Sequence, residues 1–97
     1  MIYEDGYQWL QGYLDTCIDE LVLLMLNEEQ PDMRARFVEI IGNSKMSKVI
    51  PYLEAELKNP HDDVRSWAYS SLCFFENSEA EKIAQKFRKE NPDENFL

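Results

Sequence analysis

Apolar residues recur along this chain at intervals of three and four positions rather than in alternation. Spacings of i, i+3, i+4 and i+7 place apolar side chains on one face of a helix. Prolines stand at positions 31, 51, 60 and 92, and the stretches between them are long enough for helices. The pattern therefore predicts an all-α chain of about five helices.

The first predicted helix covers residues 7–28, and the pattern leaves open whether residues 1–12 belong to it. Residues 21–26 are apolar on every side, so we expect this half of the helix to be sandwiched between neighbours. The second helix begins at Pro31, because proline suits the first helical position. It ends at residues 42–43, where Gly-Asn favours a left-handed C-cap.

The third predicted helix covers residues 46–58. Ser44 or Ser47 can cap it, and with Ser44 as the cap Pro51 falls inside the helix and bends it. The fourth helix begins after Asn59, which is a good N-cap and is followed by proline.

The fourth helix has a wide apolar face to which Trp67 belongs, and Tyr69 and Phe74 widen it. We expect this helix to be central. The fifth helix begins with the capping-box pattern Ser-Glu-Ala-Glu at residues 78–81 and has a narrow apolar stripe. The tail, residues 93–97, is expected to fray unless its last two apolar side chains tuck in.

The sequence repeats itself with an offset of 31 residues. Under this shift residues 31–34 fall on residues 62–65, and Phe37 falls on Ala68. The pattern that both copies share is an apolar helix, a short acidic turn, and Asp-(Met/Val)-Arg at the start of a second apolar helix. A helix pair of this kind cannot bury its stripe alone, so the repeat predicts stacked neighbours.

Residues 64–72 read Val-Arg-Ser-Trp-Ala-Tyr-Ser-Ser-Leu. They resemble the Val-Arg-x-x-Ala-x-x-x-Leu pattern of helix B in HEAT-like (armadillo-like) repeats. Pro51 stands where helix A of that family bends, and the first copy keeps Arg34. In the family a turn Asp pairs with the helix-B Arg of a neighbour. Glu28 and Asn59 occupy the turn positions here, so we expect an altered ladder.

The resemblance implies a short right-handed α-solenoid, formed as a single domain over residues 1–97. Its HEAT-like repeats are expected at about 16–43 and 46–76, followed by a capping helix at about 78–90. The motif says much more about the fold than about the function.

Charge is distributed unevenly along the chain. The formal net charge is −9, and residues 1–33 contain eight Asp and Glu but no Lys or Arg. Four aromatic residues lie in the same segment, namely Tyr3, Tyr7, Trp9 and Tyr13. Because phosphate contacts require Lys and Arg, such acidity argues against nucleic acid as a ligand. It is either an ordinary solvated surface or a docking surface for a basic protein.

Residues suited to catalysis are few. The only histidine, His61, is interpreted as a solvated turn residue, and Cys17 and Cys73 as small core fillers. We expect no enzyme activity, no metal and no cofactor, because neither a calcium loop nor a glycine-rich phosphate loop is found. The chain also begins without a signal-peptide pattern, and its longest apolar run is six residues, so a cytoplasmic location is expected and no membrane association.

The first functional hypothesis is an immunity protein. A small, acidic, non-catalytic domain looks like the immunity proteins of bacterial toxin systems, several of which cover the basic groove of a nuclease with carboxylates. This resemblance of type implies a basic, nuclease-type protein partner. The carboxylates assigned to the interface are Asp15, Asp19, Glu20, Glu28, Glu29 and Asp32.

The second hypothesis is a HEAT-like adaptor or assembly factor that binds a protein partner on its concave helix-B face. Glu39, Ser66 and Tyr69 are the residues expected to contact that partner. A homo-oligomer joined through residues 21–26 is a variant of this hypothesis. The third, an enzyme of the HEAT-like DNA glycosylase kind, is disfavoured because the chain lacks a basic groove.

Overall fold

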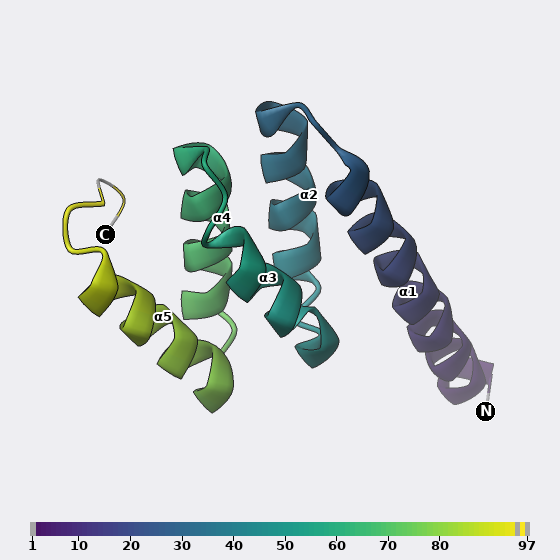
Figure 1. The fold of residues 1–97 in the computed structure, drawn as a ribbon. Helices are drawn as coiled ribbons and strands as arrows, with labels where there is room; N and C mark the ends of the chain where they lie inside the picture. Colours follow the sequence, from purple (N-terminus) through teal and green to yellow (C-terminus); the bar gives the residue numbers. More distant parts are fainter. Residues whose placement is uncertain (1, 95, 97) are drawn as a thin grey trace.

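The computed structural model describes residues 2–94 and 96, with side chains from residue 15 onward. In its described part every regular element is a helix, and there is no strand. The elements are α1 (Ile2–Asn27), α2 (Pro31–Asn43), the 3₁₀ helix η1 (Ser47–Val49), α3 (Ile50–Glu56), α4 (Asp62–Cys73) and α5 (Ser78–Glu90). In Figure 1, α2 and α4 lie side by side in the middle, α1 and α5 lie on the outer flanks, and α3 crosses in front. The prediction of a short all-α solenoid is confirmed.

The core lies where α2 and α4 pack on each other and on the remaining helices. Its side chains are mostly branched aliphatic residues, and each one stabilises the fold by about 1.5–3 kcal/mol when fully buried. The largest fully buried side chains are Met25, Ile41, Ile50, Leu53, Leu72, Val38, Val49 and Val64. Every helix from α1 to α4, and η1, contributes to this set.

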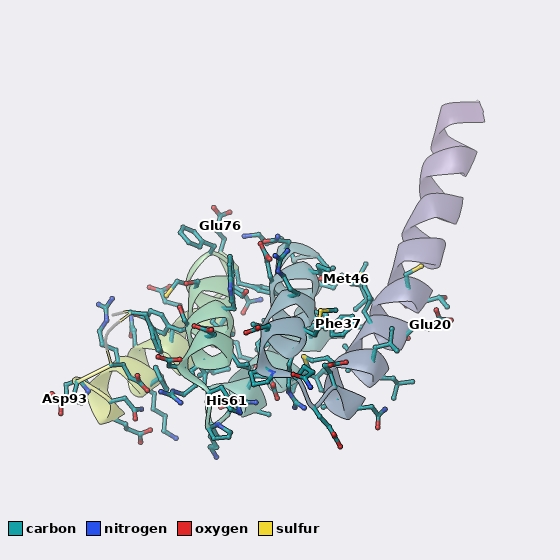
Figure 2. All side chains as sticks on the ribbon, turned by 90° about the horizontal axis from the view of Figure 1, so that it is seen from above. Glu20, Phe37, Met46, His61, Glu76 and Asp93 are labelled. Carbon is teal, nitrogen blue, oxygen red and sulfur yellow. The ribbon has the colours of Figure 1, made fainter. Side chains whose placement is uncertain are left out.

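Helix α1 begins at Ile2, so residues before the predicted start at position 7 also belong to it. Its N-terminal half projects beyond the other helices (Figure 2). The predicted sandwiching of residues 21–26 is wrong, because Leu23, Leu24 and Leu26 are exposed. The reason is that α1 is an edge helix, packed chiefly on α2. The side chains of Tyr3, Tyr7, Trp9 and Tyr13 lie outside the described residues.

The end of α2 differs from the prediction. The C-cap is Ser44 in a right-handed conformation, and the left-handed residue is Lys45, with φ of 58°. The Ser44 hydroxyl donates to the carbonyl of Ile41 at 2.5 Å and accepts from the amide of Met46 at 3.3 Å. Ser44 therefore closes α2 instead of opening the next helix. Gly42 is needed for close packing rather than for a cap.

The helix predicted at 46–58 is divided into η1 and α3, and Pro51 lies in the first turn of α3. Proline suits the first turn because the amide N–H that it lacks would have no partner within the helix there. Helix α4 starts later than predicted, with His61 as the N-cap residue. The Asn59 side chain accepts from the amide of His61 at 2.9 Å, which forms an Asx turn ahead of the helix.

Helix α5 is capped one residue before the predicted position. The Asn77 side chain accepts from the amides of Glu79 and Ala80, at 2.8 and 3.2 Å. An asparagine at the N-cap satisfies backbone donors that a helix otherwise leaves unpaired. The position of the fifth helix itself agrees with the prediction.

The aromatic residues of α4 divide into buried and exposed ones. Tyr69 is buried against Phe87 and Phe96, at ring-centroid distances of 5.8 and 5.9 Å. Phe96 thus tucks in, as one branch of the tail prediction expected, while Leu97 lies outside the described residues. The placement of Phe74 on the apolar face is wrong, since it is exposed.

Burial raises the pKa of the Tyr69 phenol, Cys73 adds to that rise, and Arg88 opposes it. The folded chain therefore holds this proton more tightly than the unfolded chain does. The resulting stability is present below the ordinary tyrosine pKa of about 10 and is lost as the pH rises through the folded pKa. We expect Tyr69→Phe to lose stability less steeply than the wild type above about pH 10. Urea midpoints at several alkaline pH values, with Tyr52→Phe as the control, measure this slope. Equal slopes for Tyr69→Phe and the wild type would contradict the prediction.

Candidate functional site

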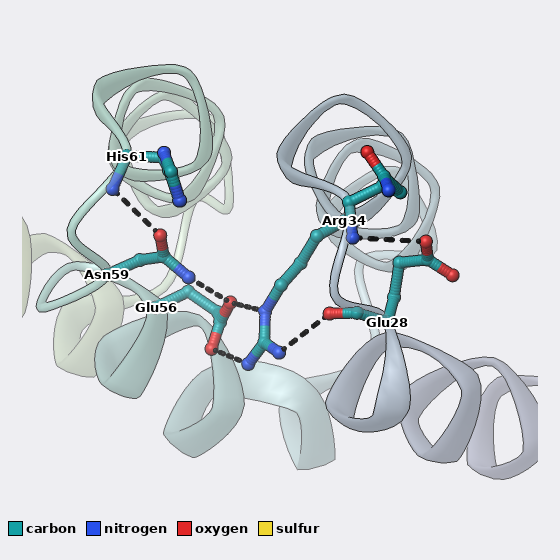
Figure 3. Close-up of polar contacts among 6 residues, drawn as sticks. Glu28, Arg34, Glu56, Asn59 and His61 are labelled. Carbon is teal, nitrogen blue, oxygen red and sulfur yellow. Dashed lines mark hydrogen bonds and ion pairs between the residues drawn. The ribbon is translucent and has the colours of Figure 1, made fainter.

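An arginine of α2, Arg34, links the turn between α1 and α2 to the end of α3. The Arg34 Nε and Nη2 donate to the two carboxylate oxygens of Glu56, at 2.6 and 2.8 Å (Figure 3). Its Nη1 donates to the backbone carbonyl of Glu28 at 3.3 Å. The hydrogen bond that Arg34 donates to Glu56 raises the pKa of Arg34, and burial opposes the rise. Glu56 is buried, so this fork is structural rather than a free binding group.

Arg65 repeats this arrangement one repeat later. Its Nη1 donates to the carbonyl of Asn59 at 2.9 Å, and its Nε and Nη2 donate to the Glu94 carboxylate at 2.7 and 3.3 Å. The ladder thus takes backbone carbonyls from the turn positions and carboxylates from Glu56 and Glu94. Sequence reasoning missed both glutamates. The sequence feature that points to Glu94 is the Asn-Pro turn in which it lies. This turn begins at Asn91, 32 residues after the Asn-Pro turn at Asn59.

The predicted acidic residues differ in the contacts that their carboxylates make. Asp15 and Asp19 both reach Lys48 of η1, at 2.6 and 2.9 Å, and Lys48 also donates to the carbonyl of Asp15 at 3.0 Å. The hydrogen bonds that Lys48 donates, first to Asp15 and then to Asp19, raise the pKa of Lys48. These two aspartates therefore face η1 with a cation already between them.

The other four carboxylates form no ion pair with Lys48, and we call Glu20, Glu28, Glu29 and Asp32 the acidic end. Glu28 is half-buried and accepts from the amide of Gln30 at 3.3 Å. Glu20, Glu29 and Asp32 are exposed, and no hydrogen bond or ion pair reaches their carboxylates from the described part of the chain. Figure 2 shows Glu20 on the side of α1 that faces away from α2.

Exposed apolar side chains lie among the acids of this end. Leu23 and Leu24 follow Glu20 by about one helical turn and are 60% and 54% exposed. Met33 follows Asp32 directly and is also exposed. Exposed apolar groups gathered beside polar ones are typical of protein–protein interaction surfaces.

The helix-B surface formed by α2 and α4 presents different residues from those predicted. Tyr69 is buried, so its assignment as a partner contact is wrong, while Glu39 is half-buried. The exposed aromatic residues there are Trp67 and Phe74, at 41% and 70%. The sequence does contain a pattern that indicates the exposure of Trp67 and Phe74. Their counterparts 31 residues earlier are Arg36 and Asn43, two polar residues that mark the solvent side of the helix.

Residues suited to catalysis are not assembled in the described part of the chain. His61 is exposed in its turn, Cys17 is half-buried, and Cys73 is exposed rather than a core filler. No group of three or more His, Cys, Asp or Glu side chains could hold a metal among the described residues. A cleft of about 620 Å³ between α3 and α5 is lined by charges of both signs, including Lys58, Lys86 and Glu90, and by no histidine or cysteine.

Comparison with known proteins identifies the family. The family model for HEAT repeats matches residues 18–95, which is most of the chain. Comparisons with curated proteins and with solved structures gave no match. Over the described residues, no helix combines the length and apolarity needed to cross a membrane. HEAT repeats are generally non-catalytic and commonly mediate protein–protein binding. With the match over residues 18–95 and the stacked helix pairs, the chain belongs to the HEAT-repeat family.

Proposed function

We propose that this HEAT-repeat chain binds a basic protein through the acidic end, and that it acts as an immunity protein which covers the nucleic-acid groove of a nuclease-type toxin. The observation that carries the proposal is the state of Glu20, Glu29 and Asp32. These carboxylates are exposed and have no partner among the described residues, and the exposed Leu23 and Leu24 lie about one helical turn from Glu20.

A basic partner follows from the charge of this region. Residues 1–33 hold eight acidic and no basic residues, and two cations that reach this region are already engaged, Lys48 by Asp15 and Asp19 and Arg34 by Glu56. A nuclease groove must be cationic to contact phosphates. Opposite charge would steer the two proteins together and speed their association. We also propose that the protein is cytoplasmic. Its HEAT-like repeats cover residues 16–43 and 46–76, and a capping helix follows at 78–90.

The six predicted carboxylates have unequal roles in this proposal. Glu20, Glu29 and Asp32 are the primary contacts because their charge is not compensated internally. Asp15 and Asp19 are secondary because they must leave Lys48 or share it with the partner. Glu28 contributes charge while its side chain accepts from the turn.

Charge reversal tests the proposal. The triple variant Glu20→Lys, Glu29→Lys, Asp32→Lys should bind the partner at least about 100-fold more weakly, since opposite-charge contacts become repulsive. The partner is isolated on the tagged chain from native lysate, identified by mass spectrometry, purified, and measured by biolayer interferometry at low and high salt. Its nuclease activity is then assayed with and without the chain.

The matched control carries the same change of charge elsewhere, in Glu54→Lys, Glu76→Lys, Glu90→Lys. These three glutamates are exposed on α3, on the turn after α4 and on α5. The control should bind within a few-fold of the wild type. The proposal would be contradicted by a folded acidic-end variant that keeps full affinity, or by a partner whose only interacting domain is acidic.

A second candidate, an adaptor that binds on the helix-B face, is favoured by the exposed Trp67 and Phe74. Aromatic residues of this kind often supply the central contacts of an interface. If the adaptor hypothesis is right, the double variant Trp67→Ala, Phe74→Ala should weaken partner binding at least about 10-fold. Far-UV circular dichroism should stay unchanged, and Tyr52→Ala, at an exposed aromatic of α3, is the control. Unchanged affinity in the double variant would exclude this face.

A further inference from the structure

One flank of α2 has apolar side chains where the equivalent flank of α4 is covered. Met33, Phe37 and Ile40 correspond, at the offset of 31, to Val64, Ala68 and Ser71. Val64 and Ala68 have no exposed surface, and Ser71 is 9% exposed. Met33 and Ile40 are 50% and 48% exposed, and Phe37 is half-buried. We call these three α2 residues the α2 flank.

The flank of α4 is covered by helix α2 itself. Gly42 of α2 approaches Ser71 so closely that a Cβ atom at Gly42 would lie 2.5 Å from the Ser71 Cβ. The side of α2 that is buried also includes Ala35 and Val38. Ile41 is buried there as well, so the close approach of α2 to the α4 flank depends on Gly42 at the point of contact with Ser71.

We propose that the α2 flank receives an α-helix of the basic partner, packed as α2 itself packs on α4. This proposal rests on the proposed function and names how the partner binds. The spacing of the flank, i, i+4 and i+7, is that of one helix face, so a single helix can cover all three side chains.

The bulk of the flank determines the side chains of the docked helix. Met33, Phe37 and Ile40 are larger than Val64, Ala68 and Ser71, so the approaching helix must carry small residues such as alanine or glycine on its seam. The carboxylates of Glu29 and Asp32 lie close to the N-terminal end of the flank in sequence. They favour lysine or arginine at the corresponding end of the docked helix.

A second copy of this chain is the less suitable occupant. Two copies joined at this flank would bring close together the acidic segments that precede it, residues 1–33, each with eight acidic and no basic residues. Like charges at an interface oppose association. The charge of the flank's surroundings therefore selects a basic partner helix over self-association.

The first test uses a defined probe. A fluorescent stapled peptide with an alanine seam and lysine flanks is titrated against the full chain, beside one peptide with glutamate flanks and one with a leucine seam. We expect only the alanine–lysine peptide to bind. Its binding should shift the methyl NMR signals of Met33 and Ile40 and leave the Trp67 indole signal unchanged.

The second test uses a variant of the flank. Ile40→Asp should weaken binding of the peptide and of the purified natural partner at least 10-fold. Because Ile40 is about half exposed, the variant should remain folded by circular dichroism. Tyr52→Asp, which changes an exposed apolar residue of α3 in the same way, is the control and should bind normally.

The outcomes separate this inference from the proposed function. If acidic-end charge reversal abolishes partner binding while Ile40→Asp changes neither the partner nor the peptide, helix docking is overturned and the proposed function stands. If Ile40→Asp abolishes both while charge reversal has no effect, the docking flank stands and the charge-based function fails. A dimer in sedimentation that Ile40→Asp dissolves, or peptide-induced shifts at Trp67 alone, would also overturn helix docking.

Discussion

Arg34→Met should lower the free energy of unfolding by about 3–5 kcal/mol, the range for removing one partner of a buried ion pair. The Glu56 carboxylate is buried and receives both arms of the Arg34 fork. Without the arginine its charge has no counterion, and only the Asn59 side-chain amide, at 3.5 Å, still reaches it. The variant also releases the carbonyl of Glu28. Urea unfolding followed by circular dichroism measures the loss.

The control for this variant is Arg36→Met on the same helix. Arg36 is exposed and has no ion pair among the described residues, so its replacement should change stability by less than about 0.5 kcal/mol. The double variant Arg34→Met, Glu56→Leu should recover most of the loss because no buried charge remains. A loss of less than about 1 kcal/mol in the free energy of unfolding for Arg34→Met alone would show that the ion pair with Glu56 contributes little to stability.

Gly42→Val is expected to destabilise the chain by about 3 kcal/mol or more, at the upper end for overpacking a core. A Cβ at position 42 would lie 2.5 Å from the Cβ of Ser71, and the Ser71 hydroxyl oxygen would be closer still. The Ser71 Cβ is fixed to its backbone, so no change of rotamer relieves the contact. The two central helices must then move apart. Thermal and urea unfolding measure this loss.

Rescue distinguishes a clash at the α2–α4 contact from a loss of glycine itself. Gly42→Ala should be destabilising alone, and Ser71→Gly should restore part of the stability when the two are combined. Asn43→Ala, at the exposed neighbouring position, should be close to neutral. Equal stability of Gly42→Ala and wild type would mean that the helices separate without cost.

Local chemistry made much of the fold predictable. Proline at the start of α2, asparagine ahead of α4 and the 31-residue offset located the helices within a few residues. The caps were less predictable, because Ser44 and Ser47, and likewise Asn77 and Ser78, stand close together and each can serve as a cap. Periodicity alone also could not show that α1 is an edge helix, since that depends on what packs against it.

The candidate site was less predictable because it depends on tertiary contacts. Lys48 engages Asp15 and Asp19 from more than 25 residues away, which no local pattern reveals. Tyr69 and Trp67 are two positions apart on one helix, yet one is buried and the other exposed. Comparing the two repeats would have resolved this, because Trp67 matches Arg36 whereas Tyr69 matches the buried Val38.

The projecting half of α1 has a hydrodynamic consequence. The molecule measures 53 × 30 × 16 Å, and its radius of gyration is 14.6 Å. A compact domain of this length would have a radius of gyration of about 12.5 Å. An elongated monomer of this kind diffuses more slowly than a sphere of equal mass and leaves a size-exclusion column early. Its elution volume would mimic that of a heavier species, so light scattering or sedimentation equilibrium is needed to count subunits.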